Sequence, residues 1–206
     1  MLKIVNGKKL YKGRVVLDNI NLEFKQNKCY ALVGTNGSGK TLILKALCGY
    51  IKLTAGEVFQ DEVRIRKDKD FITDAGILIE SPEMISDYSI LENLKLIAKI
   101  KNEITEKEIL EYIKLFNLEK HKDTKFKNCS LGTKQKARII QSIMEKNKIL
   151  IIDEPFNGLD SASAEKFRKF LLEYKKNNLI ILTSHNKSDI DLLADELIYI
   201  EEGEIK

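Results

Sequence analysis

The sequence predicts an α/β fold with a mainly parallel core sheet, an antiparallel β portion on the N-terminal side and an inserted helical segment. Short, continuous apolar runs such as Ile149–Ile152 are typical of strands buried on both faces of a parallel sheet. Helical patterns dominate between Ser89 and Lys146, whereas strand patterns occur toward both ends. Because 206 residues suffice for about one domain, we expect a single domain, 1–206, with a helical subdomain of about 82–146 inserted into its core.

The composition excludes several classes of protein. Hydrophobic residues make up 43% and charged residues 32% of the chain, a globular balance that excludes disorder as the main state. No apolar run approaches the roughly 20 residues that a membrane-spanning helix needs. The start, Met1–Gly7, turns polar too soon for a signal peptide. The net charge of +4 comes with interleaved acidic residues, so we expect a solvated surface and no nucleic-acid partner.

The three cysteines, Cys29, Cys48 and Cys129, lie far apart in the chain. They form neither a metal-binding pattern nor an even set for disulfides. Because thiols stay reduced in the cytoplasm, we predict free cysteines packed in the core of a cytoplasmic protein.

A strand, a loop and a helix are predicted in succession in the first fifty residues. Apolar and polar residues alternate over 20–24, which is the period of a half-buried strand. Cys29–Val33 is a continuous apolar run that ends at Gly34, as expected of a buried strand. Apolar residues within 43–47 then share one helical face, and Gly49 is typical of a helix end.

Two capping boxes predict helix starts in the middle of the chain. Ser89 with Glu92, and Thr105 with Glu108, have the spacing that lets each pair of side chains close free backbone donors of a first helical turn. The predicted helical insertion is built from these helices.

Two further core strands and a hairpin are predicted toward the C-terminus. Ile149–Ile152 and Leu179–Leu182 are apolar runs, and a helical pattern from about 161 to 176 separates them. Apolar residues of 197–200 and Ile205 flank Glu202-Gly203, which is typical of a terminal hairpin.

A phosphate-binding loop is predicted between the first buried strand and the helix after it. Residues 34–41 fit the pattern G-x-x-x-x-G-K-S/T, whose glycines let backbone N–H groups turn toward phosphate, while the helix adds the positive end of its dipole. Lys40 is expected to reach the β- and γ-phosphates of a nucleotide, and the Thr41 hydroxyl to bind Mg²⁺. An ordinary glycine turn is the alternative interpretation. The loop consists of Gly34, Thr35, Asn36, Gly37, Ser38, Gly39, Lys40 and Thr41.

Two acidic residues follow the buried strand Ile149–Ile152, at the sheet edge where ligands of open α/β sheets collect. Asp153 is suited to hold Mg²⁺, and Glu154 to polarise a water molecule for attack on a γ-phosphate. Taken alone, such a pair could equally be a helix start or a solvated turn. Its place behind a phosphate loop favours the functional interpretation.

Four further features select one family. The stretch 128–136 precedes the Asp153 strand, 157–160 follows it, His185 comes after the next strand, and Tyr11 stands ahead of the phosphate loop. In this order, over almost the whole chain, they resemble the signature, the D-loop, the switch histidine and the adenine-stacking residue of ATP-binding cassette (ABC) ATPases. The signature reads Asn128-Cys129-Ser130-Leu131-Gly132-Thr133-Lys134-Gln135-Lys136, and the D-loop reads Asn157-Gly158-Leu159-Asp160.

The resemblance implies a P-loop NTPase fold with a RecA-like core, and an ATPase that uses ATP and Mg²⁺. Lys40, Glu154 and His185 would then be catalytic. Tyr11 would stack on the adenine ring of the nucleotide. Tyr11 packing at a sheet edge and a purely structural histidine are the alternatives for these two residues.

The resemblance also implies a dimer, because the signature of one subunit meets the γ-phosphate held by a second. Ser130, Gly132 and Asp160 therefore join the predicted nucleotide site. Two copies of this chain could form such a head-to-tail pair, and a mixed pair is the alternative. Ser130 could also simply cap the helix that begins near Leu131.

The sequence departs from the family pattern at two positions. Glu80 stands where the family usually has Gln, so it could serve as a metal ligand, although its charge would oppose phosphate unless a metal is bound or the carboxyl is protonated. Leu131 replaces the first glycine of the usual signature. The Ser-Leu-Gly form and the surroundings of Glu80 resemble bacterial cassettes of drug, bacteriocin and lantibiotic export or immunity.

The function implied is that of an ATP-hydrolysing subunit that powers transport, most plausibly export, through a separate transmembrane permease. Such a protein would lie in the cytoplasm, peripheral to the inner face of the cell membrane. Two alternatives stay open at this point. One is a non-transport cassette that acts on nucleic acid or ribosomes, and the other is a phosphotransferase with a phosphate loop.

Overall fold

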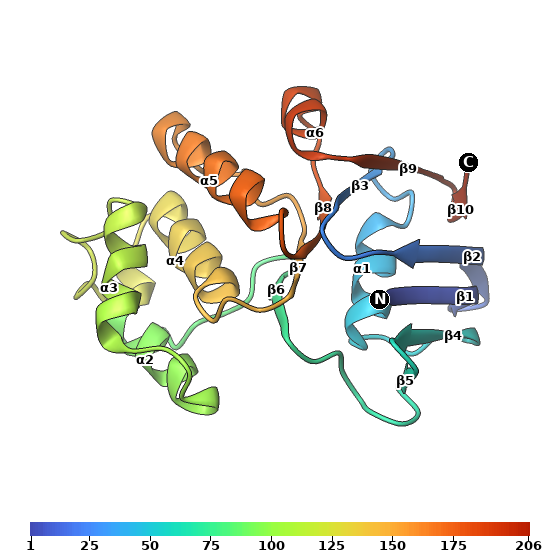
Figure 1. Ribbon diagram of the computed structural model, residues 1–206, viewed down its shortest axis with the longest axis horizontal. Helices are drawn as coiled ribbons and strands as arrows, with labels where there is room; N and C mark the ends of the chain where they lie inside the picture. Colours follow the sequence, from blue (N-terminus) through green and yellow to red (C-terminus); the bar gives the residue numbers. More distant parts are fainter.

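The computed structural model, which describes residues 1–206, places two β-sheets side by side and gathers most of the helices beyond one of them (Figure 1). The strands are β1 Leu2–Tyr11, β2 Arg14–Phe24, β3 Cys29–Val33, β4 Ala55–Gln60, β5 Val63–Ile65, β6 Ala75–Leu78, β7 Ile149–Ile152, β8 Leu179–Thr183, β9 Glu196–Glu201 and β10 Glu204–Ile205. The helices are α1 Lys40–Cys48, α2 Ile90–Lys101, α3 Glu106–Leu115, α4 Leu131–Ile143, α5 Ser161–Tyr174 and α6 Lys187–Leu193, with a short 3-10 turn at Phe126–Asn128.

The six-stranded core sheet has the order β10-β9-β3-β8-β7-β6. Strands β9, β3, β8, β7 and β6 are parallel, and only β10 pairs antiparallel, with β9. Along β7, Leu150 and Ile152 point into one hydrophobic core, whereas Ile149 and Ile151 point into the other. Both faces of the sheet are therefore buried, which confirms the physical basis of the predicted parallel strands.

The second sheet is antiparallel, with the order β2-β1-β4-β5. It faces one side of the core sheet, and α1 contributes Ile43, Leu44 and Leu47 to the core that the two sheets share. The alternation over 20–24 and the helix stop at Gly49 were predicted, and the structure has both. The pairing of β1 with β2, across the turn Lys12-Gly13, and with β4 was not predicted. Strand β4 lies far from β1 in the chain, so that pairing leaves no local pattern.

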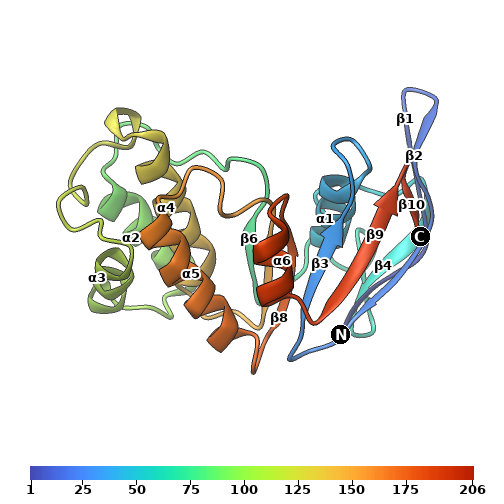
Figure 2. The same cartoon turned by 90° about the horizontal axis from the view of Figure 1, so that it is seen from above.

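On the other side of the core sheet, α4 contacts β6, and α2 and α3 pack against α4 (Figure 2). Both predicted capping boxes form, with Ser89 and Thr105 as N-caps of α2 and α3. The core on this side is continuous, because one cluster of 25 buried residues contains side chains from these helices and from the strands. The predicted insertion thus packs directly onto the sheet.

Two local predictions were wrong. Helix α5 ends at Tyr174, short of the predicted end near 176, because its last turn tightens and Lys176 N–H bonds to the carbonyl three residues back, that of Glu173. Cys129 is only half-buried, unlike the buried Cys29 and Cys48, since it lies between a short 3-10 turn and the exposed start of α4.

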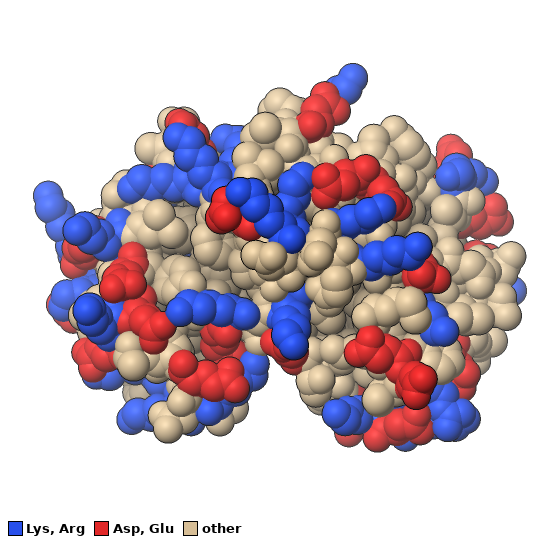
Figure 3. All heavy atoms as spheres, in the orientation of Figure 1, with Lys and Arg blue, Asp and Glu red and all other residues tan.

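The surface carries charges of both signs. Basic and acidic side chains are interspersed over the face shown in Figure 3. Most ion pairs, such as Lys95–Glu106 and Lys169–Glu165, join exposed side chains, and pairs of this kind contribute little to stability. None of the helices combines the length and the apolar character that crossing a bilayer requires.

Candidate functional site

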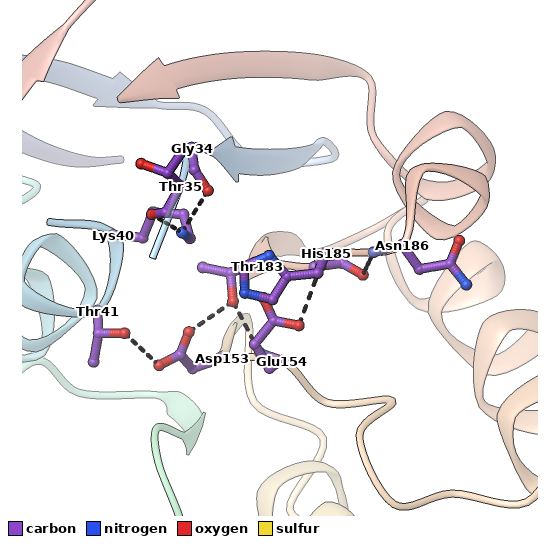
Figure 4. Close-up of polar contacts among 10 residues, drawn as sticks. Gly34, Thr35, Lys40, Thr41, Asp153, Glu154, Thr183, His185 and Asn186 are labelled. Carbon is purple, nitrogen blue, oxygen red and sulfur yellow. Dashed lines mark hydrogen bonds and ion pairs between the residues drawn. The ribbon is translucent and has the colours of Figure 1, made fainter. Parts of the chain in front are cut away.

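The loop between β3 and α1 is shaped to receive an anion. Gly39 is the N-cap of α1 at φ 111°, a left-handed conformation that favours glycine, and no side chain caps this helix end. Free N–H groups at a helix start attract anions. The Lys40 side chain folds back over the loop, and its Nζ donates to the carbonyls of Gly34 at 2.7 Å and Thr35 at 2.9 Å (Figure 4).

One more atom of the loop lacks a partner within the protein. The Ser38 hydroxyl is buried, with the residue 3% exposed, and its oxygen makes no hydrogen bond. Buried polar groups are nearly always paired in native proteins. Because this oxygen is closed off from the surface, it is not placed to meet a ligand.

Asp153 joins three elements at the carboxyl end of β7. Its Oδ2 accepts a hydrogen bond from Thr41 of α1 at 2.7 Å, and its Oδ1 accepts one from Thr183 of β8 at 2.6 Å. The same Thr183 hydroxyl accepts from the backbone N–H of Glu154 at 2.9 Å. The structure thus brings Thr41 and Asp153 together, as the sequence predicted.

Glu154 and His185 face each other beside this network (Figure 4). The backbone N–H of His185 donates to Glu154 Oε2 at 3.2 Å, and Nε2 of the imidazole lies 3.3 Å from Oε1. Burial raises the pKa of the Glu154 carboxyl, and the charge and N–H of His185 oppose this rise. A half-buried carboxylate held by a histidine is suited to act as a base toward a nearby proton.

These side chains line one open cleft of about 240 Å³ between the phosphate loop and the ends of β7 and β8. Its walls are polar apart from Leu42, so the cleft suits a charged ligand rather than an apolar one. The lining residues are Asn36, Gly37, Gly39, Lys40, Thr41, Leu42, Asp153, Glu154 and His185.

The predicted signature lies outside this cleft, at the start of α4. Ser130 is the N-cap, and its hydroxyl accepts from the N–H of Thr133 at 3.2 Å and donates to the Thr133 hydroxyl at 2.9 Å. Leu131 is 71% exposed. Ser130 therefore caps α4, as the alternative interpretation expected. The helix start is nevertheless exposed to solvent and accessible to an anion.

Gly132 allows the start of α4 to touch the predicted D-loop. A Cβ atom at this position would lie 2.8 Å from the carbonyl oxygen of Gly158, so only glycine fits without a shift. Asp160 caps α5 by accepting from the N–H of Ser163 at 2.8 Å, and it pairs with Lys136 of α4 at 2.7 Å. The Lys136 hydrogen bond is the main cause that lowers the pKa of Asp160.

Tyr11 and Glu80 also lie outside the cleft. Tyr11 ends β1 with 62% of the residue exposed, and the Lys12 ammonium lies 5.7 Å from its ring centre. Glu80 has a left-handed backbone at φ 58° and pairs with Lys45 of α1 at 2.5 Å. The repulsion that the sequence predicted between Glu80 and phosphate is thus offset by a neighbouring cation.

Thr183 and Lys45 were not identified from the sequence. Thr183 directly follows an apolar run and precedes His185 by two residues, so the shared carboxyl edge of parallel strands could have pointed to it. Lys45 lies four residues after Thr41 and so on the same face of α1. Its pairing with Glu80 is a tertiary contact without a local signal.

The sequence matches a protein-family model described as ABC transporter over residues 17–157. The uncharacterized ABC transporter ATP-binding protein YybJ of Bacillus subtilis is 37% identical over 207 residues, which cover 100% of this chain and 95% of that protein. The lantibiotic transport ATP-binding protein SrtF of Streptococcus pyogenes is 35% identical, over 100% of this chain and 89% of its own length. The bacitracin transport ATP-binding protein BcrA of Enterococcus faecalis is 31% identical, over 100% and 68%.

Solved structures agree with these relatives. The dimeric structure of MJ0796, a bacterial ABC transporter cassette, matches with a TM-score of 0.89 and 25% identity over 100% of this chain and 97% of that one. A post-hydrolysis state of MJ0796 bound to ADP and Pi matches with a TM-score of 0.88. These likenesses confirm the predicted fold class and the predicted family resemblance, including the likeness to lantibiotic cassettes.

Replacing Thr183 by valine, which has the same shape without the hydroxyl, should destabilise the fold. The change leaves one Asp153 oxygen and the Glu154 N–H without their partner, and unpaired buried groups cost about 1–3 kcal/mol each. Urea unfolding followed by circular dichroism measures the loss. Thr183→Ser is the matched control and should stay near wild type, and equal stability of the valine variant would contradict the proposed bridging role of the hydroxyl.

Proposed function

The chain belongs to the ABC transporter family as an ATP-binding and ATP-hydrolysing subunit, and on that premise we propose that it powers export through a separate transmembrane permease. The observation that carries the ATPase chemistry is the cleft itself, whereas the transport role is supported by the relatives. The cleft lies beside a helix start that no side chain caps. It brings together a buried lysine, a bridging aspartate and a glutamate–histidine pair. This is the set of groups that binding and cleaving a nucleoside triphosphate requires.

The phosphates of ATP would occupy the loop 34–41. The N–H groups at the start of α1 and the Lys40 ammonium supply positive charge. The Tyr11 ring is exposed at the end of β1 and is free to stack on adenine, a contact that needs only an open aromatic face. The remaining loop residues would contact phosphate through their backbone.

The residues present fit Mg²⁺. The Thr41 hydroxyl and the Asp153 carboxylate lie 2.7 Å apart, and both are hard oxygen ligands of the kind that this cation prefers. When bound, the cation would neutralise phosphate charge. Glu80 would act on the same ion only at a distance, because its carboxylate is already paired with Lys45.

Hydrolysis would use the glutamate–histidine pair. The Glu154 carboxylate would accept a proton from the attacking water, and burial makes this carboxyl a stronger base than an exposed one. His185 would keep the carboxylate oriented through its backbone N–H and its imidazole. Its ring, on the solvent side of the pair, would donate to the γ-phosphate.

A second subunit would complete each site. The start of α4, which Ser130 caps, is exposed and suited to bind an anion, but it lies outside the cleft that would hold this subunit's own ATP. In a head-to-tail pair it would meet the γ-phosphate held by the partner, with Gly132 and the Asp160-capped D-loop alongside. Each chain carries both half-sites, so a homodimer would contain two complete sites.

The partnership with a permease is inferred from the relatives, whereas export is inferred from the resemblance of the signature to that of export cassettes. SrtF and BcrA are named for lantibiotic and bacitracin transport. Their names favour a transporter over a nucleic-acid or ribosome factor. We place the protein on the cytoplasmic face of the cell membrane, docked to its permease.

Lys40→Ala should weaken ATP binding itself. The substitution removes the cation that faces the phosphates, and charge-assisted hydrogen bonds of this kind are worth about 1.5–3 kcal/mol, so the Kd should rise about tenfold or more. Isothermal titration with ATP and Mg²⁺ measures the change. The exposed Lys169→Ala variant is the control, and an unchanged Kd for Lys40→Ala would refute the assignment of Lys40.

Glu154→Gln should retain ATP binding and accumulate an ATP-bound dimer, because the amide cannot accept the proton of the attacking water. Size-exclusion chromatography with light scattering, with and without ATP, reports the mass. Adding Ser130→Arg should abolish this dimer while the monomer still binds ATP, since the arginine fills the anion site. A monomer of Glu154→Gln at saturating ATP would argue against the two-subunit site.

The transporter role is tested by recovering the Glu154→Gln variant with ATP from detergent-solubilised native membranes. A multi-span membrane protein is expected to accompany it, and mass spectrometry would identify that protein. Lys40→Ala, which should not form the closed ATP-bound dimer, is the matched control. Recovery of soluble partners or nucleic acid alone would contradict the transport role and favour a non-transport function, without contradicting the ATPase activity.

A further inference from the structure

A single cation on α5 contacts the segments that follow both catalytic side chains. The Nε of Arg168 donates to Oδ1 of Asp189 on α6 at 2.6 Å. The guanidinium carbon of Arg168 also lies 5.1 Å from the ring centre of Phe156. Helices α5 and α6 are neighbours at this point (Figure 2).

The two contacts lie close along the chain to the catalytic pair. Phe156 is two residues after Glu154, in the turn that the N–H of Asn157 closes on the carbonyl of Glu154 at 3.2 Å. Asp189 is four residues after His185, in the first turn of the seven-residue helix α6. Arg168 therefore contacts both segments, and Glu154 and His185 contact each other.

The Arg168–Asp189 pair places a carboxylate inside the protein. Asp189 is 1% exposed, and its Oδ2 has no hydrogen-bond partner. Arg168 is its only ion-pair partner, so the buried carboxylate depends on this guanidinium. A buried ion pair contributes little net stability compared with apolar side chains of the same volume, but it fixes geometry through directed hydrogen bonds.

The same groups border a cavity that reaches the catalytic pair. Phe156, Arg168 and Asp189 line a space of about 540 Å³ together with Glu154 and His185. No other lysine or arginine lines it. Across this space, Arg168 contacts both the turn after Glu154 and the helix after His185.

We propose that Arg168 is a positioning residue that fixes the position of the turn after Glu154 relative to the helix after His185. It thereby keeps the two catalytic side chains together. Asp189 and Phe156 are its two anchors. The role rests on the proposed hydrolysis at Glu154. It acts on the rate of hydrolysis and not on ATP binding, because Lys40 and the phosphate loop lie on other elements.

The test separates positioning from mere stability by comparing two variants. Arg168→Ala leaves Asp189 as an unpaired buried charge, so both the melting temperature and kcat should fall. Arg168→Ala combined with Asp189→Asn removes that charge, so the melting temperature should recover. Its kcat should stay about tenfold or more below wild type, because small misplacements of catalytic groups cost up to about a hundredfold, with Kd for ATP within about twofold of wild type. Lys169→Ala, which breaks an exposed pair on the next residue of α5, is the control.

A second readout does not depend on hydrolysis. The chain has two histidines, His121 and His185, so their imidazole signals in a carbon–proton NMR spectrum can be assigned with a His185→Ala variant. In both Arg168 variants the His185 signals should move, and those of His121 should stay.

Recovery of kcat together with stability in the double variant, or unmoved His185 signals, would overturn the positioning role. Absence of ATP hydrolysis by the wild type would instead contradict the proposed function, and the NMR comparison would still decide the role of Arg168.

Discussion

The geometry of the cleft depends on one carboxylate that ties three elements together. Asp153 accepts from Thr41 at the start of α1 and from Thr183 at the end of β8, while it sits itself at the end of β7. Hydrogen bonds to an ionised group are the stronger kind, and these two use both oxygens. Lys40 lies next to Thr41 in the chain, and Glu154 and His185 follow the two strands. This bridge therefore contributes to the spacing of the side chains that line the cleft.

Such a bridge is useful only on a rigid base, and burial of the core sheet on both faces supplies one. Alternate residues of β7 enter the core shared with the antiparallel sheet and the core shared with the helices. A shift of one residue in strand register would exchange the two sets of side chains. Close-packed cores resist such changes, so the strand ends that carry Asp153 and Thr183 have little freedom to move apart.

The features that were predictable from sequence are those that local geometry determines. The buried strands, the phosphate loop and the capping boxes at Ser89 and Thr105 follow from spacing within a few residues. The antiparallel sheet was predicted only as a region, and the pairing of β1 with the distant β4 has no local pattern. Contacts between elements, such as Thr183 with Asp153, have no pattern along the chain. The same holds for Arg168 with Asp189, since an isolated arginine on a helix is usually a solvated one.

The charges around Glu80 show how a departure from the family pattern is accommodated. The residues from 79 to 88 form no helix or strand, yet several hydrogen bonds and ion pairs attach this segment to its neighbours, two of them on α1 and α4. Glu80 pairs with Lys45 of α1, and Arg138 of α4, which is 4% exposed, donates to the carbonyl of Pro82 at 3.0 Å. The first pair is largely exposed, and such pairs contribute about 0–1 kcal/mol. Breaking the second would leave a buried charged donor unpaired, which costs more. The segment is therefore held more strongly to α4, which carries the predicted signature, than to α1.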